Sequence, residues 1–289
     1  MHQVLSPKQL AQAIGVSESS LKRWADDGLI RVTRTAGGHR RIPLAEALRF
    51  VRESDQAIVD PDVLGLGELK AVGRDSASDD AERLFRYLEE GNATAARGLI
   101  MKLYVDGRPV HEICDGPVHD AMQRLGHPGE HRSEEIFREH RATELVKQAL
   151  HQLQGLIDVD EDAPVAVGGA PSGDPYALPS LAAAVSLRAV GVRTVNLGPD
   201  TPLESLEHAC RETSARMVWL AVSAPLPEPA AFATRVVKLA EVLAGRSASV
   251  VVGGRMADAL NLPSRRNLLV GGSMGELVAF GRGLVLARS

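Results

Sequence analysis

Basic and hydroxyl side chains gather near the N-terminus in two neighbouring stretches. The first stretch carries Ser19, Ser20, Lys22 and Arg23, which we expect on the exposed face of one helix. The second stretch contributes Arg34, Thr35, Gly38, His39, Arg40 and Arg41. Guanidinium, ammonium and hydroxyl groups donate hydrogen bonds to phosphate oxygens and base edges, and a glycine lets backbone approach a phosphate closely. These residue types predict contact with double-stranded DNA.

The charge distribution supports this interpretation. Residues 1–54 hold nine Lys and Arg against five Asp and Glu, a balance of +4, whereas the whole chain carries −4, which leaves −8 for the remainder. Scattered cations usually form only a solvated face, but these cluster on two adjacent motifs. A small basic module on an acidic body indicates that one end meets a polyanion and the other has a different task.

The elements around these residues predict a helix-turn-helix. Residues 7–14 have a helical apolar pattern that Gly15 ends, and Ser17 is the expected N-cap of a second helix with Leu21 and Trp24 facing inward. Two helices joined by a glycine turn in so short a stretch are typical of that motif. Trp24 is therefore assigned to the core.

A basic hairpin follows the two helices. Residues 30–42 are rich in β-forming residues around a tip at Gly37-Gly38, and Pro43 opens a helix over roughly 43–53. A basic helix followed by a basic hairpin can straddle a DNA groove. We therefore expect a winged helix-turn-helix domain over residues 1–54.

Residues 4–53 resemble the DNA-binding domain of the MerR family and its excisionase-like relatives. The run Arg34-Thr-Ala-Gly-Gly-His-Arg40 is the most specific part of the likeness. Other matching positions are Leu10, Gly15, Val16, Leu21, Arg23, Trp24, Gly28, Leu29 and Ile42. The resemblance implies that the second helix enters the major groove and that the wing touches the backbone.

Three further segments are predicted after this domain. Residues 55–78 mix Asp, Gly, Pro and Ser and are expected to be a partly ordered linker. Residues 79–157 predict a four-helix bundle, and residues 163–289 a Rossmann-like doubly wound parallel sheet, so that the fold class is multidomain α and α/β. The bundle helices are expected at 79–90, 92–106, 109–125 and 132–154. Strands are expected at 165–167, 192–197, 216–223, 248–252 and 267–270, with helices at 178–190, 203–213, 229–244 and 274–286.

Residues 79–286 resemble the B12-binding module of light-responsive MerR-type repressors, in which adenosylcobalamin sits between the bundle and the sheet. The family's cobalt-binding loop reads Asp-x-His-x-x-Gly, and this chain has Asp174, Tyr176 and Pro179 at the three defined positions. A neutral imidazole is a good cobalt ligand, whereas a protonated phenol is a poor one. The resemblance therefore implies a B12-type fold without its metal ligand.

Two other family signatures are partly kept. The Glu-His pair over the upper face of the cofactor is present as Glu139-His140, but the expected Trp ten residues earlier is Gly129. The Ser-x-Leu/Thr signature is Ser223-Ala224-Pro225, and a Gly-Gly follows later. The candidate cofactor-binding residues are thus Glu139, His140, Asp174, Tyr176, Ser223, Gly253 and Gly254. His140 could line a pocket or be a partly buried structural histidine.

Together these observations predict a transcription regulator that binds operator or promoter DNA. We expect this regulator to be a repressor. We expect no cofactor and no metal; adenosylcobalamin bound without a histidine ligand, or another small ligand, stays open. No Gly-x-Ser-x-Gly, His-Glu-x-x-His or P-loop is present, so no enzyme is expected. The two cysteines, and the lack of a signal peptide or a long apolar run, predict a cytoplasmic protein. One short DNA-reading domain favours a homo-oligomer, a dimer or tetramer, on paired sites.

Overall fold

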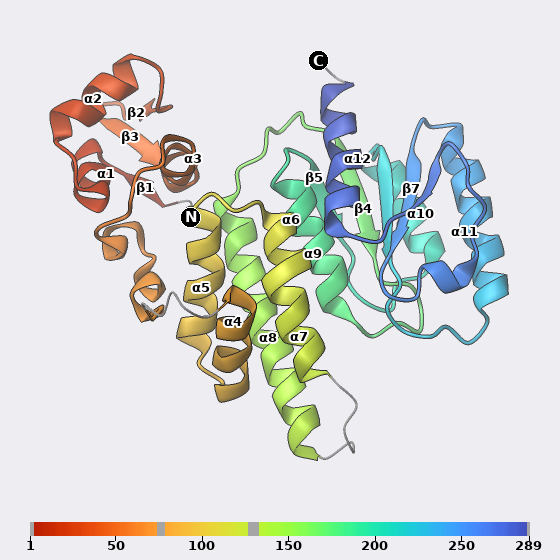
Figure 1. Cartoon of the computed structure of the whole chain (residues 1–289). Helices are drawn as coiled ribbons and strands as arrows, with labels where there is room; N and C mark the ends of the chain where they lie inside the picture. Colours follow the sequence, from red (N-terminus) through yellow and green to blue (C-terminus); the bar gives the residue numbers. More distant parts are fainter. Residues whose placement is uncertain (1–2, 74–78, 127–132, 288–289) are drawn as a thin grey trace. The chain divides into compact units, whose positions relative to one another are not determined.

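The computed structural model describes residues 3–73, 79–126 and 133–287 (Figure 1). The chain divides into two compact units. The first unit comprises Met1–Pro109 and Gly116–Asp158, and the second comprises Val110–Asp115 and Val159–Ser289. The predicted winged helix-turn-helix and most of the predicted bundle thus lie in the first unit. Residues 110–115 of the predicted bundle belong to the second unit, together with the predicted sheet.

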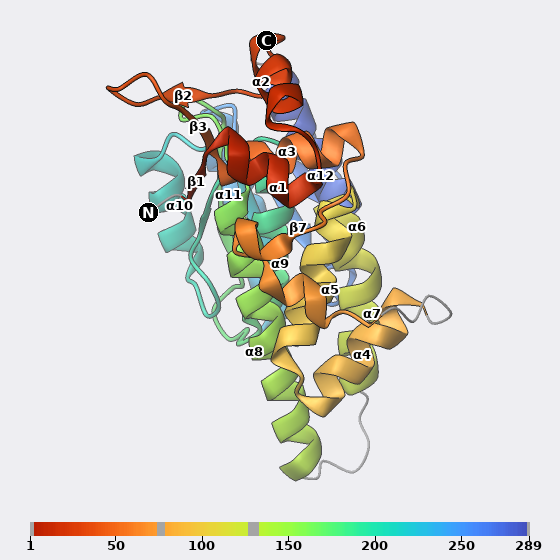
Figure 2. The same ribbon diagram turned by 90° about the vertical axis from the view of Figure 1, so that its left-hand side faces the viewer.

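The N-terminal part is a winged helix-turn-helix. Its helices are α1 (Pro7–Ile14), α2 (Glu18–Asp26) and α3 (Leu44–Ser54), and its strands are β1 (Val4–Leu5), β2 (Thr33–Arg34) and β3 (Arg40–Pro43). The strands pair antiparallel in the order β1-β3-β2. Figure 2 shows the β2–β3 hairpin projecting away from the helices of this domain as a wing.

Local sequence explains where the first two helices begin and end. Ser6 and Gln9 form a capping box at the start of α1, and Gly15 ends it with a φ of 71°, in the left-handed region that glycine adopts without strain. Ser17 caps α2 by accepting the Ser20 N–H. Leu21 is buried, and the half-buried Trp24 packs on Phe50 with ring centroids 5.2 Å apart. The inward placement of both residues is confirmed.

The bundle helices are α4 (Asp80–Glu90), α5 (Ala93–Val105), α7 (His119–Leu125) and α8 (Ser133–Leu156). Their contacting pairs include α4 with α5, α7 and α8, and α5 with α8. The single helix expected over 109–125 is instead α6 (Val110–Ile113), a π-helical stretch (Cys114–Val118) and then α7. Pro117 lies inside that stretch, and its missing N–H breaks the regular ladder.

The segment between the winged domain and the bundle contains two short 3-10 helices, η1 (Pro61–Leu64) and η2 (Gly67–Ala71). Leu64 and Leu66 are buried. Gly98 of α5 permits close packing of this segment, since a Cβ there would lie 2.2 Å from the Glu68 carbonyl oxygen. The described part of residues 55–78 is therefore packed rather than free.

The second unit is built on a five-stranded parallel sheet in the order β5-β4-β6-β7-β8. Its strands are β4 (Val165–Gly169), β5 (Arg193–Asn196), β6 (Met217–Ala221), β7 (Ser249–Gly253) and β8 (Leu268–Val270). Its helices are α9 (Ala177–Arg188), α10 (Leu203–Glu212), α11 (Pro229–Ala244), the short η4 (Asp258–Leu260) and α12 (Met274–Leu286). The predicted alternation of strands and helices is confirmed.

Helices cover both faces of this sheet (Figure 1). Residues of α10 and α11 pack on one face in a cluster with Val218 and Val250, and residues of α9 and α12 pack on the other with Met217 and Trp219. Strand order reverses between β4 and β6, the place where open α/β sheets bind ligands at their carboxyl ends. Among the described residues, no helix has the length and apolar character that a membrane crossing requires.

Candidate DNA-binding interface and the strand ends of the sheet

Helix α2 carries four of the predicted DNA-contact residues. Lys22 and Arg23 are exposed, and Lys22 pairs with Glu18 at 2.8 Å on the same helix. The hydroxyls of Ser19 and Ser20 lie within hydrogen-bond distance of the Ser17 hydroxyl, at 2.8 and 2.9 Å. Both serines therefore help to order the start of α2, while the two cations extend into solvent.

The wing tip is a tight turn that its own residues hold. Thr35 accepts the His39 N–H on its hydroxyl at 3.2 Å and the Gly38 N–H on its carbonyl at 2.8 Å. Gly38 has a φ of 78°, which explains the glycine at this position. Arg34 and His39 are exposed beside the turn. The wing thus presents a cation and an imidazole on a short, ordered hairpin.

Arg40 has a more specific place than the sequence indicates. Its guanidinium donates to the Asp26 carboxylate at 2.5 Å and to the Lys22 carbonyl at 3.2 Å. It therefore braces the wing against α2 and fixes their spacing, while Arg41 is half-buried on the same strand. Sequence reasoning assigned both arginines to DNA contact and missed this brace.

A buried carboxylate supports the wing from below. Glu46 on α3 is 8% exposed, accepts the Arg31 N–H at 2.7 Å and pairs with Arg49, which also donates to the Leu29 carbonyl. Burial raises the pKa of Glu46, but hydrogen bonds from Arg49 and Arg31 outweigh it and leave the pKa below its ordinary value of 4.5. The sequence signal that could have revealed this buried ion pair is an acidic residue within the apolar stripe of α3.

In the second unit, Asp174 ties two strand ends together. It is fully buried, and its carboxylate accepts the N–H groups of Tyr176 at 3.0 Å, Ser223 at 2.5 Å and Ala224 at 2.9 Å. The loop after β4 is thereby joined to the loop after β6. Because backbone donors surround the carboxylate, Asp174 has a structural role here.

Tyr176 and the glycines after β7 belong to the same edge of the sheet. Tyr176 is 40% exposed, with the Arg255 guanidinium 4.8 Å from its ring centroid, and Arg255 donates to the Ser223 carbonyl at 2.5 Å. Gly253 ends β7, and Gly254 has a φ of 100°. A Cβ on Gly254 would lie 2.4 Å from the Val222 carbonyl oxygen, so the chain's own packing requires glycine there.

A large indole fills the space between the sheet and α9. Trp219 is 2% exposed, and a Cβ on Gly168 of β4 would lie 2.1 Å from its ring, so that the indole rests directly on the backbone. Its Nε1–H donates to the Ser180 hydroxyl at 3.1 Å, and that hydroxyl donates to Asn196 at 2.7 Å. Sequence reasoning did not single out this residue.

The remaining candidates lie on α8 in the first unit. Glu139 is half-buried and His140 is exposed. The interpretation of His140 as a partly buried structural histidine is therefore wrong. Gly129, at the position of the family's Trp, lies outside the described residues.

Comparison with known proteins decides what the first domain is. Residues 6–42 match the family model described as MerR family regulatory protein. The N-terminal domain is a MerR-type DNA-binding domain. A curated relative, the HTH-type transcriptional repressor CarA of Myxococcus xanthus, is 26% identical over 231 residues, covering 76% of this chain and 77% of its own length. The match thus concerns the N-terminal domain, and the chain as a whole is similar to a transcriptional repressor.

Solved structures similar to this chain include a corrinoid protein and a cobalamin-binding protein. The monomethylamine corrinoid protein of Methanosarcina barkeri has a TM-score of 0.49 at 15% identity, covering 69% of this chain and 95% of its own. A cobalamin-binding protein of Desulfitobacterium hafniense has a TM-score of 0.35 at 14% identity, with coverages of 72% and 98%. At such low scores these likenesses add nothing to the assignment.

Proposed function

We propose that this MerR-type regulator is a repressor that binds operator DNA as a homo-oligomer and works without B12. The observation that carries the B12 part is Tyr176, a phenol at the position where the resemblance to B12 modules calls for a metal-binding imidazole. The similarity to the CarA repressor supports the repressor role and argues against an enzyme.

For the DNA contact we propose α2 and the wing. Lys22 and Arg23 would reach into the major groove, and Arg34, His39 and Arg41 would meet the backbone. Exposure of the first four of these side chains supports the assignment, as does the brace from Arg40, which sets the distance between helix and wing. Ser19, Ser20, Thr35 and Gly38 complete the proposed contact surface, and they also hold the start of α2 and the turn of the wing.

The residues at the sheet's strand ends do not fit B12. A phenol stands in place of the imidazole at Tyr176, and it is stacked with Arg255. The Asp174 carboxylate is occupied by three backbone N–H groups. Between the sheet and α9, the Trp219 indole rests directly on the backbone of Gly168.

We propose a homo-oligomer because one short DNA-binding domain recognises too few base pairs for a specific site. We further propose that the copies associate through the second unit. Size-exclusion chromatography and DNA-shift assays on protein purified without cobalamin test the proposal. The expected result is an oligomer that binds DNA equally with and without adenosylcobalamin, in the dark and in light. A monomer that assembles on DNA only with adenosylcobalamin in the dark would overturn it.

A further inference from the structure

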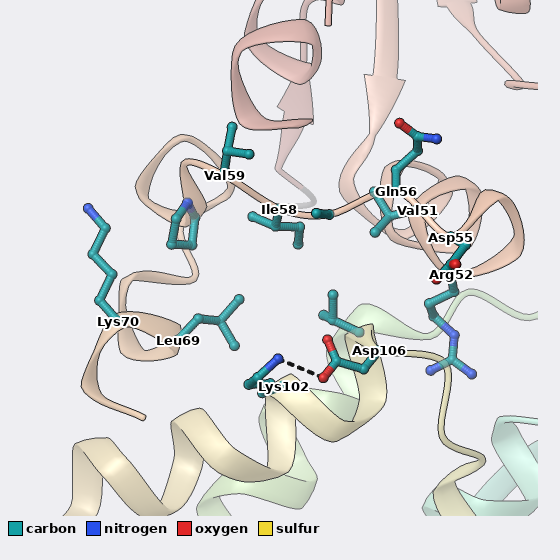
Figure 3. A pocket seen from close by; sticks show the side chains of 13 residues that line it. Val51, Arg52, Asp55, Gln56, Ile58, Val59, Leu69, Lys70, Lys102 and Asp106 are labelled. Carbon is teal, nitrogen blue, oxygen red and sulfur yellow. Dashed lines mark hydrogen bonds and ion pairs between the residues drawn. The ribbon is translucent and has the colours of Figure 1, made fainter. Parts of the chain in front are cut away.

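A cavity of about 470 Å³ lies in the first unit, between the end of α3, the segment carrying η1 and η2, and α5 (Figure 3). Much of its lining is apolar, with Val51 from α3, Ile58 and Leu69 from the connecting segment and Val105 from α5. This volume is within the range that binds small organic ligands. None of the residues assigned to DNA contact lines the cavity.

The three cations that line the cavity differ in their partners. Lys102 pairs with Asp106 at 2.7 Å, drawn as the dashed line in Figure 3, and Lys70 pairs with Asp62. Arg52 instead donates to the Tyr104 carbonyl, with its guanidinium 3.8 Å from that ring's centroid.

No carboxylate among residues 3–73, 79–126 and 133–287 lies within ion-pair distance of Arg52. Burial lowers the pKa of Arg52, an effect that Tyr104 and Glu53 only partly offset. A half-buried guanidinium without a counter-ion favours an incoming anion. Asp55, which also lines the cavity, is exposed and its charge is solvated.

The walls of the cavity are joined to the DNA-reading helices. The N–H groups of Val59 and Asp60 donate to the Ala13 carbonyl at the end of α1, at 2.8 and 3.1 Å. The Val59 side chain lies against Gly15, in the turn between α1 and α2, where a Cβ would be 3.2 Å away. On the other wall, α3 contacts α2 through Phe50 and Trp24. A ligand that displaces the connecting segment would therefore displace the turn between α1 and α2. A ligand that displaces α3 would displace helix α2.

We propose that this cavity binds a small organic anion with a hydrocarbon body, a medium-chain carboxylate, and that its occupancy changes the affinity for DNA. The carboxylate pairs with Arg52, and the chain lies against Val51, Ile58 and Leu69. The effect on DNA rests on the proposed function, whereas binding of the anion does not. Such regulation requires that the anion bind more tightly to one state of the DNA-binding domain than to another.

Isothermal titration calorimetry of the full chain without DNA tests the binding. The probes are decanoate, decanol and decyltrimethylammonium, each below its micellar concentration. Decanoate is expected to bind one to one and at least about tenfold more tightly than the other two. Arg52→Gln should weaken decanoate binding by about tenfold or more, and Leu69→Trp should block the cavity without removing a charge. Arg235→Gln, which removes a cation from the second unit, is the matched control and should leave binding unchanged.

DNA titrations with and without decanoate test the coupling. The wild-type midpoint is expected to shift with decanoate, and the midpoint of Leu69→Trp is expected not to. Equal binding of decanoate and decanol, or decanoate binding unchanged in both Arg52→Gln and Leu69→Trp, would overturn the proposed site. A wild-type midpoint insensitive to bound decanoate would overturn the coupling. Failure of the ligand-free chain to bind any DNA would instead contradict the proposed function.

Discussion

Arg23 and Arg40 were both predicted to contact DNA, yet they are held differently. Arg23 is exposed, with no ion-pair partner among the described residues, whereas Arg40 is bound to Asp26 and to the Lys22 carbonyl. A free cation adds its charge to the DNA contact. A paired cation adds mainly geometry, because its charge is already neutralised within the domain.

Arg23→Ala is expected to weaken operator binding and to reduce the slope of log affinity against log salt by about one, since one phosphate contact is lost. Arg40→Ala should also weaken binding, with a smaller change in slope. Fluorescence anisotropy over a salt series measures both. Asp26→Ala is the partner control, and its effect should not add to that of Arg40→Ala. Identical slope changes for the two arginine variants would contradict the brace.

Glu46 predicts a pH dependence of the winged domain. Its folded pKa lies below 4.5, so the stabilisation that its ion pairs supply is complete above pH 4.5 and is lost as the pH falls through the folded pKa. Hydrogen–deuterium exchange of peptides covering residues 29–54 in the full chain should rise as the pH is lowered below 4.5, after correction for intrinsic exchange. Glu46→Gln should raise exchange at neutral pH and remove that extra sensitivity. Equal profiles for the two proteins would refute this role.

At the residue scale, the sequence predicted the type of chemistry and not every partner. The motif around Gly38 and His39 predicted a DNA-reading wing because its residue order is specific. The ion pair between Arg40 and Asp26 could not be predicted, because it joins two elements whose spacing depends on tertiary packing. Trp219 was overlooked because it is an apolar residue within an apolar strand. The sequence pattern does not show which buried residue of such a strand packs against a particular helix.

Among the elements, helix and strand positions were predictable since period and caps are local. The doubly wound sheet followed from the alternation, whereas the strand order with β4 between β5 and β6 did not. The π-helical stretch at Cys114–Val118 was also missed, although Pro117 within an expected helix was a warning. Packing of η2 on α5 depends on Gly98, whose lack of a side chain has meaning only once the partner is known.

The contact of the Trp219 indole on β6 with Gly168 on β4 leads to a prediction about stability. Trp219→Ala should destabilise the second unit by roughly 3–5 kcal/mol, since a buried indole and its hydrogen bond to Ser180 are lost. Gly168→Ala should also be destabilising, because the new methyl group would overlap the indole. Urea unfolding followed by circular dichroism measures both. Trp219→Phe, the matched control, should be milder, and a Trp219→Ala protein as stable as wild type would contradict the packing account.

Asp174 makes a second prediction at this scale. Asp174→Ala should loosen the loops after β4 and β6, since three N–H groups lose their acceptor. Exchange of the amides of Ser223 and Ala224 is the measurement, and it should accelerate. Asp200→Ala, which removes an exposed carboxylate bonded to the Gly173 N–H, is the nearby control and should leave those two amides protected. Amides that stay protected in Asp174→Ala would show that the Asp174 carboxylate does not hold the two loops together.

For the molecule as a whole, the chain joins a MerR-type DNA-binding domain to an α/β domain that we propose works without B12. The MerR-type domain has its helix, turn and wing, and the chain is similar to CarA over most of its length. At the strand ends of the sheet, Tyr176 stacks with Arg255, and in the middle of β6 the buried Trp219 packs against α9. On these two observations rests our proposal that regulation does not depend on B12.

The absorption spectrum of the purified protein, after incubation with adenosylcobalamin and desalting, tests this central claim most directly. We expect a spectrum with the protein band alone in the wild-type protein, because Tyr176 supplies no imidazole to bind cobalt. A corrin band that stays with the wild-type protein through desalting would contradict it.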